Sequence, residues 1–202
     1  MLEQLESRTL LVATSIPISD PTEFVATADF NADGRADAVT TSYATQKLHV
    51  LLGNGSGGFA SPITIQLSLS PDHVAAADLN GDAKADLIMT HFEAGNVGVM
   101  LGNGDGSFQL PVYYSAGSGS RAVVPADFDN DGRIDLVTAK SYLPTLTFLK
   151  GNGGGGFAPP VNLSLSIIPT DLTADDFNAD GKLDLAAVDY HKDQLAILYG
   201  NG

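Results

Sequence analysis

The segment DFNADGRAD, residues 29–37, sets the architecture of this chain, because close copies of it recur at one fixed interval. The copies are DLNGDAKAD at 78–86, DFDNDGRID at 127–135 and DFNADGKLD at 176–184, so each begins 49 residues after the one before. A second motif keeps this step: LLGNGSGGF from Leu51, MLGNGDGSF from Met100, LKGNGGGGF from Leu149 and LYGNG from Leu198. A constant interval of this length indicates a repeat architecture.

Short runs of β-branched and apolar residues lie between these motifs, for example ADAVTTS at 36–42 and KLHVLLG at 47–53. Each run is long enough for a strand and too short for a helix. In the second repeat we expect strands at Val74–Asp78, Ala85–Thr90, Val97–Leu101 and Leu110–Tyr114. Four short strands per repeat are typical of a propeller blade. The sequence therefore predicts an all-β fold, a β-propeller of four 49-residue, four-stranded blades.

The two ends of the chain complement each other in this repeat. One step back from ITIQLS, the fourth strand of the first repeat, lies TSIPIS at 14–19, whereas the last repeat stops after its third strand. Pairing Ser15–Ser19 with Leu195–Tyr199 would complete the last blade and cover two open edges. The four blades would then form a closed ring; the alternative is that they are part of a larger propeller. We divide the chain into a leader, 1–13, and the propeller repeats, 14–202.

The four acidic loops present oxygen ligands at alternate positions. Asp stands at positions one, five and nine, Asn or Asp at three, and Arg or Lys at seven, where the main-chain carbonyl is the expected ligand. The predicted metal ligands are Asp29, Asn31, Asp33, Arg35, Asp37, Asp78, Asn80, Asp82, Lys84, Asp86, Asp127, Asp129, Asp131, Arg133, Asp135, Asp176, Asn178, Asp180, Lys182 and Asp184.

This all-oxygen set favours Ca²⁺ over Mg²⁺, which demands a stricter octahedron, and over Zn²⁺, which prefers His or Cys. We expect up to four Ca²⁺ ions. The loops are not EF-hand loops, because position twelve, which is Glu in that motif, is Thr40, Met89, Thr138 or Ala187. The alternative is that Asp, Asn and Gly only form turns. Ala83 replaces Gly at position six of the second loop, so strain there predicts a weaker site.

The charge of the chain resides mainly in these loops. The net charge is −14, and the loops carry 13 of the 24 acidic residues. This sign opposes binding to a phosphate backbone, so we expect no nucleic-acid partner. The sequence has no apolar run long enough for a membrane span. No catalytic constellation recurs, and the scattered His49, His73, His91 and His191 are expected to be ordinary strand or surface residues, so we predict no enzyme activity.

The segments between the second and third strands differ from repeat to repeat. They are YATQK from Tyr43, FEAGN from Phe92, SYLPT from Ser141 and YHKDQ from Tyr190. Varied loops on a repeated scaffold are typical of recognition surfaces, and aromatic residues beside polar groups suit a sugar or a protein. Plain solvated turns are the alternative.

The order strand, DxNxDGxxD, two further strands and GNGxGxF resembles the FG-GAP repeat, also described as the VCBS repeat and found in the propeller of integrin α subunits. The resemblance implies calcium in the loops, no catalysis, and an extracellular or cell-surface module for adhesion or for recognition of a glycan or an extracellular protein. Propellers of this family commonly have seven blades, so an incomplete propeller that oligomerises is also expected.

The alternative function is an accessory propeller of a secreted polysaccharide-acting enzyme whose catalytic domain is not in this chain. In the leader, LESRTLL at 5–11 is similar to the LEPR-xLL segment that opens some large bacterial surface proteins.

Overall fold

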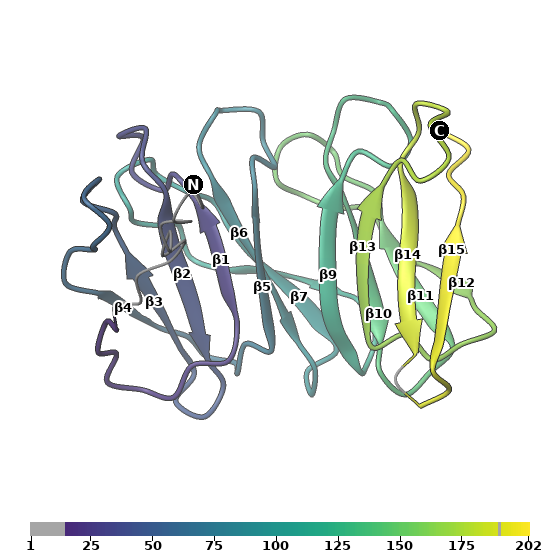
Figure 1. Cartoon of the computed structure of the whole chain (residues 1–202), viewed down its shortest axis with the longest axis horizontal. Helices are drawn as coiled ribbons and strands as arrows, with labels where there is room; N and C mark the ends of the chain where they lie inside the picture. The colour runs from purple at the N-terminus through teal and green to yellow at the C-terminus, as the bar shows by residue number, and fades with distance from the viewer. Residues whose placement is uncertain (1–14, 190) are drawn as a thin grey trace, which may run out of the picture.

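The computed structural model describes residues 15–189 and 191–202, and in this part of the chain it contains strands and no helix. Fifteen strands form four antiparallel sheets that follow one another along the molecule (Figure 1). The all-β, propeller-like architecture is thus confirmed. The predicted leader, 1–13, lies outside the described residues.

Each sheet corresponds to one repeat, with neighbouring strands paired in chain order. The first three sheets consist of β1 (Val25–Ala28), β2 (Asp37–Ser42), β3 (Lys47–Leu51) and β4 (Ile63–Gln66); β5 (His73–Ala77), β6 (Asp86–His91), β7 (Asn96–Met100) and β8 (Val112–Ser115); β9 (Ser120–Ala126), β10 (Asp135–Lys140), β11 (Thr145–Leu149) and β12 (Val161–Ser164). The fourth sheet consists of β13 (Asp171–Asp175), β14 (Asp184–Asp189) and β15 (Gln194–Leu198). All four strands predicted in the second repeat are present, each displaced by at most two residues at either end.

The core lies between successive blades. Strands β6 and β10 are buried at every position, whereas β12 is exposed at every position. Both faces of β6 and of β10 pack against a neighbouring sheet, so even polar residues of these strands such as Thr90 and Lys140 are buried. Between the first two blades, for example, Val39 and Leu48 share a buried cluster with Leu87 and Met89.

The glycine-rich turns fasten each blade to the one before it. A Cβ atom on Gly102 would lie 2.3 Å from the carbonyl oxygen of Ala85, so only glycine fits this close approach. Further along the same turn, the amide of Gly106 donates to the carbonyl of Phe30 in the preceding blade at 2.9 Å, and Phe108 packs edge-on against the Phe30 ring at 5.6 Å. The constant spacing of the acidic motif and the glycine-rich motif along the chain thus brings Gly106 and Phe108 next to Phe30 of the preceding blade.

The predicted pairing of Ser15–Ser19 with Leu195–Tyr199 is wrong. Residues 15–19 form no strand, and β15 is the edge of a three-stranded sheet. The next residue explains where the segment lies: Asp20 accepts a hydrogen bond from Lys47 Nζ at 3.0 Å and its other oxygen lies 3.2 Å from Nε2 of the buried His49. These contacts hold the segment against β3 in the first blade, away from the fourth.

The series of blades is consequently open. Strand β5 packs beside β1, β9 beside β5, and β13 beside β9, while β1 and β13 make no comparable contact in the described chain. On the free face of the fourth blade Phe177 is 47% and Leu195 62% exposed, although their counterparts in the first blade, Phe30 and Leu48, are buried. Asp175, at the position held by small residues in the other repeats, lies exposed beside this free face.

Candidate functional site

The four acidic loops lie at the same end of the blades, each between the first and second strands of its sheet (Figure 1). In the first loop, Asp29 directly follows β1 and Asp37 is the first residue of β2. The loop must therefore reverse the chain within seven residues, which requires unusual backbone angles and local acceptors for its amides.

The aspartate at position one supplies those acceptors. Its two oxygens in the first loop accept the amides of Asp33 at 3.1 Å and Gly34 at 2.7 Å. The same two bonds recur from Asp78, Asp127 and Asp176. The aspartate at position five likewise accepts the amide of position seven, as Asp33 does from Arg35 at 3.0 Å. These bonds bring the predicted ligands together in a tight, carboxylate-lined turn.

Backbone strain is shared by all four loops, which corrects one expectation. Ala83 has a positive φ of 62°, as predicted. The other loops, however, place a non-glycine residue at a positive φ at position four, where the second loop has Gly81: Ala32 at 56°, Asn130 at 57° and Ala179 at 60°. Each loop thus has one glycine and one other residue in the left-handed region, and strain does not distinguish the second loop.

The aspartate at position nine joins two motifs. In the second repeat the buried Asp86 accepts the amide of Leu79 in the acidic loop at 2.9 Å and the amide of Gly102 in the glycine-rich turn at 2.8 Å. Asp37, Asp135 and Asp184 make the equivalent pairs of bonds. The sequence suggested only a metal ligand here, whereas the structure gives this residue a backbone-clamping role as well.

Burial makes two of these clamps electrostatically costly. It raises the pKa of Asp86 and of Asp135, although the amides that each accepts oppose the rise. The neighbouring carboxylates Asp78 and Asp82 raise the pKa of Asp86 further, and Asp129 and Asp131 do the same for Asp135. A cation among these groups would relieve both the repulsion and the burial penalty.

The third loop has the densest set of carboxylates. Asp127, Asp129 and Asp135 each place one oxygen within 4.8 Å of the others, a spacing that suits a shared metal ion. Among His, Cys, Asp and Glu side chains in residues 15–189 and 191–202, this is the one group of three or more so arranged. It arises because position three is Asp129 here and Asn in the other loops.

The same loop carries a cation of its own. Lys150 Nζ forms ion pairs with Asp129 and, at 3.1 Å, with Asp131. Its hydrogen bond to Asp129 and then that to Asp131 raise the pKa of Lys150, and the bond to Lys150 lowers the pKa of Asp131. The equivalent residues of the first two repeats are Leu52 and Leu101, so the extra acid and the lysine occur together.

The side chains at position seven are also close to the loop acids, as when Arg35 lies 3.5 Å from Asp33 and Lys84 3.4 Å from Asp82. These pairs are partly exposed and contribute little stability.

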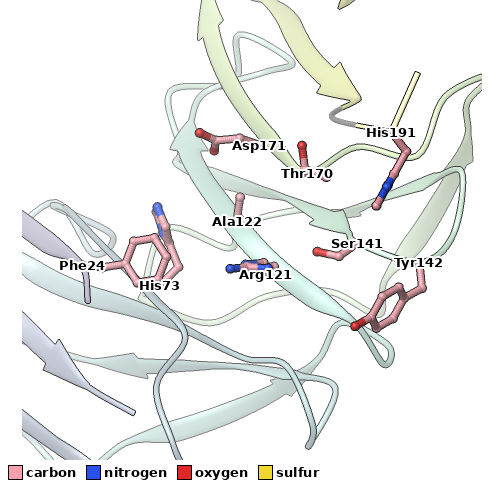
Figure 2. Close-up of a pocket in the computed structure, with 9 residues that line it drawn as sticks. All are labelled: Phe24, His73, Arg121, Ala122, Ser141, Tyr142, Thr170, Asp171 and His191. Atoms are coloured by element: carbon pink, nitrogen blue, oxygen red, sulfur yellow. The ribbon is translucent and has the colours of Figure 1, made fainter. Parts of the chain in front are cut away.

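The opposite end of the blades holds a cavity of about 660 Å³. Figure 2 shows its lining, which comes from the starts of the first strands and from the turns that vary between repeats: Phe24, His73, Arg121, Ala122, Ser141, Tyr142, Thr170, Asp171 and His191. The sequence indicated the varied turns, two of which contribute Ser141, Tyr142 and His191. The sequence did not indicate Arg121, and it predicted no functional role for His73 or His191.

The remaining histidines are structural. His49 contacts Asp20 as described, and the buried His91 places Nδ1 at 2.9 Å from the carbonyl of Ser70.

Comparison with known proteins agrees with this architecture. The model of the FG-GAP-like repeat matches residues 29–89 and 84–138, which together exceed half of the chain. The fold and the acidic loops define a repeat propeller with carboxylate-lined turns. The chain belongs to the FG-GAP-like repeat family. No curated protein sequence matches it significantly.

Several solved structures share the fold at low identity. A lectin from Agrocybe aegerita that recognises non-reducing terminal N-acetylglucosamine is similar over 87% of this chain and 51% of its own, with 19% identity and a TM-score of 0.57. The BBS1N protein in complex with ARL6DN is similar over 88% of this chain and 53% of its own, with 13% identity and a TM-score of 0.58.

A further similar structure is the Photorhabdus luminescens Tc holotoxin pore, with 22% identity, a TM-score of 0.54, and coverage of 86% of this chain and 9% of that one. The chain thus spans about half the length of the lectin and of BBS1N. The described residues contain no helix that is long and apolar enough to cross a membrane.

Proposed function

We propose that this chain is a non-catalytic, calcium-stabilised propeller module that recognises a glycan or a protein outside the cell. The observation that carries the proposal is the cluster of carboxylate oxygens of Asp127, Asp129 and Asp135 in the third of four equivalent loops. Three acids within a few ångströms repel each other by several kcal/mol at an effective dielectric constant of about 20, and a divalent cation reverses that sign. The family supports calcium as that cation and an extracellular location.

The proposed ligands are the oxygens at positions one, three, five and nine of each loop, together with the carbonyl at position seven. Position nine already accepts two amides, yet each carboxylate oxygen retains a second lone pair, so clamping and coordination are compatible. Recognition is proposed for the opposite end, because the turns there vary and surround a cavity. The lectin with the same fold supports a glycan as one class of partner.

Thermal unfolding in calcium and in chelator tests the metal part. An ion that binds only the folded chain stabilises it by RT ln(1 + [L]/Kd), about 2.7 kcal/mol per site at one hundred times Kd. We expect the midpoint to rise clearly in millimolar CaCl₂ relative to EGTA, and to rise less in MgCl₂. Equal midpoints in the calcium and EGTA samples would refute a stabilising calcium ion.

A further inference from the structure

The cavity opposite the acidic loops contains a guanidinium group, Arg121, that forms no ion pair in the described residues, although its charge opposes the burial that raises the pKa of the nearby Asp72. Arg121 extends from β9 into the middle of the cavity, between the adjacent rings of Phe24 and His73 on one side and Tyr142 on the other (Figure 2). Within residues 15–189 and 191–202, no carboxylate oxygen lies within ion-pairing distance of Arg121, whose side chain is exposed. Arginine is always charged and binds carboxylates through two parallel hydrogen bonds.

Comparison between repeats shows that Arg121 has lost the structural role of its counterparts. In the first repeat Glu23 accepts the amide of Tyr43 at 3.0 Å, and in the second Asp72 accepts the amide of Phe92 at 2.7 Å. These acids fasten the turn between the second and third strands. Arginine cannot accept a hydrogen bond, and in the third repeat the amide of Ser141 instead donates to the carbonyl of Gly119 at 3.0 Å.

A second polar group in the cavity is also without a partner. Ser141 is 6% exposed, and its buried hydroxyl makes no hydrogen bond in the described structure. In Figure 2 this hydroxyl points toward the middle of the cavity, where Arg121 lies. A buried hydroxyl without a hydrogen bond is costly, so a ligand that supplies an acceptor would favour rotation of the Ser141 side chain further toward the cavity.

The walls suit a sugar ring. The rings of Phe24 and His73 are in contact, tilted by 57° with their centroids 5.1 Å apart, and Tyr142 packs edge-on against Phe92 at 5.4 Å. Thr170 and the exposed Asp171 line the far side and offer acceptors for hydroxyl groups. The volume lies within the range of small-ligand sites.

The negative charges around the cavity favour a ligand that carries a single carboxylate over one that carries many. The groove beside it, which shares Phe24, Arg121 and Tyr142, is also lined by the acids Glu23 and Asp72, and the chain carries a net charge of −14. A long polyanion would be repelled, whereas one carboxylate can pair with Arg121.

We propose that this cavity binds a sugar bearing a single carboxylate, such as a terminal uronic acid residue, with the carboxylate on Arg121 and the ring against the aromatic walls. The inference rests on the proposed recognition function and gives it a substrate class.

The test compares three probes by calorimetry in saturating calcium: methyl glucuronide, methyl glucoside, which lacks the carboxylate, and acetate, which lacks the ring. We expect the glucuronide to bind at least about tenfold more tightly than either of the others, because its carboxylate accepts charge-assisted hydrogen bonds from Arg121. Arg121→Gln should reduce the preference over the glucoside to within about twofold, whereas Lys47→Gln, in β3 of the first blade, should leave it unchanged.

Three results would overturn the inference: equal binding of glucuronide and glucoside, equal binding of acetate and glucuronide, or a preference that survives Arg121→Gln. Melting in calcium and EGTA is measured on the same samples. Absence of glucuronide binding with an intact calcium shift refutes this inference alone, whereas loss of the calcium shift refutes the metal part of the proposed function.

Discussion

The two ends of the blades differ in what the repeat preserves and what it changes. At the loop end, Asp29, Asp78, Asp127 and Asp176 make the same two hydrogen bonds in every copy. At the other end, one equivalent position is occupied in turn by Glu23, Asp72, Arg121 and Thr170. One end therefore maintains the blade, and the other is free to acquire a ligand. The predictions below test this division.

The largest expected effect concerns the clamp at position nine. Asp86→Ala leaves the amides of Leu79 and Gly102 without their acceptor, which should cost about 2–4 kcal/mol of the free energy of unfolding. Urea unfolding in EGTA isolates this contribution from any metal. Asp82→Ala, in the same loop but on the surface, is the matched control and should change stability much less in EGTA. Similar losses in both variants would show that the clamp has no special role.

The next effect is the loss of one ion. Asp131→Ala removes the carboxylate at position five of the third loop, so native mass spectrometry in calcium should detect one Ca²⁺ fewer than in the unchanged protein. Arg121→Gln, at the opposite end, should retain the full number. An unaltered ion count for Asp131→Ala would contradict the ligand assignment.

A smaller effect is expected at Lys150, whose ammonium occupies part of the third loop. Lys150→Leu restores the residue found at the equivalent positions of the first two repeats and removes a competing positive charge. Calcium affinity at this loop should rise roughly thirtyfold, because the Coulomb repulsion between an ammonium group and a divalent cation at about 4 Å in a water-like dielectric is about 2 kcal/mol. Competitive titration with a calcium chelator measures it, with Lys47→Leu, far from the loops, as the control for net charge. A fall in affinity would mean that Lys150 helps to assemble the site.

The smallest effect is a pH dependence that belongs to the cavity end. Burial lowers the pKa of His73 and of His91 below the ordinary value of 6.5. In this pH range these histidines bind protons more readily in the unfolded chain than in the folded chain. The free energy of unfolding should therefore fall as the pH drops from about 7.5 to 5.5. His73→Phe, which copies Phe24 of the first repeat, should flatten part of this slope in urea unfolding. An unchanged slope would exclude His73 as its source.

The sequence predicted those features that depend on the repeat itself. The interval between DFNADGRAD and its copies was sufficient for the blades, for the order of the strands and for the place of the carboxylates. The clamp at Asp86 was missed because its second partner, Gly102, lies in another motif, and only folding brings the two together.

The edge of the fourth blade and the cavity were missed for a related reason. A match to the repeat predicted a strand at Ser15–Ser19, but the adjacent Asp20 contacts Lys47 and His49, polar partners that no periodic pattern indicates. The cavity around Arg121 combines side chains from all four repeats at positions where they differ, so self-similarity cannot reveal it.

The contact from Gly106 back to Phe30 has a consequence for synthesis on the ribosome. A blade is latched only by the turn of the repeat that follows it, as Leu79 is by Gly155 at 3.3 Å. A newly made blade must therefore wait, with an apolar flank uncovered, until most of one further repeat has been translated: β4 ends at Gln66 and its blade is latched by Gly106. We expect nascent chains to be most vulnerable to aggregation during this delay, and chaperones to act there.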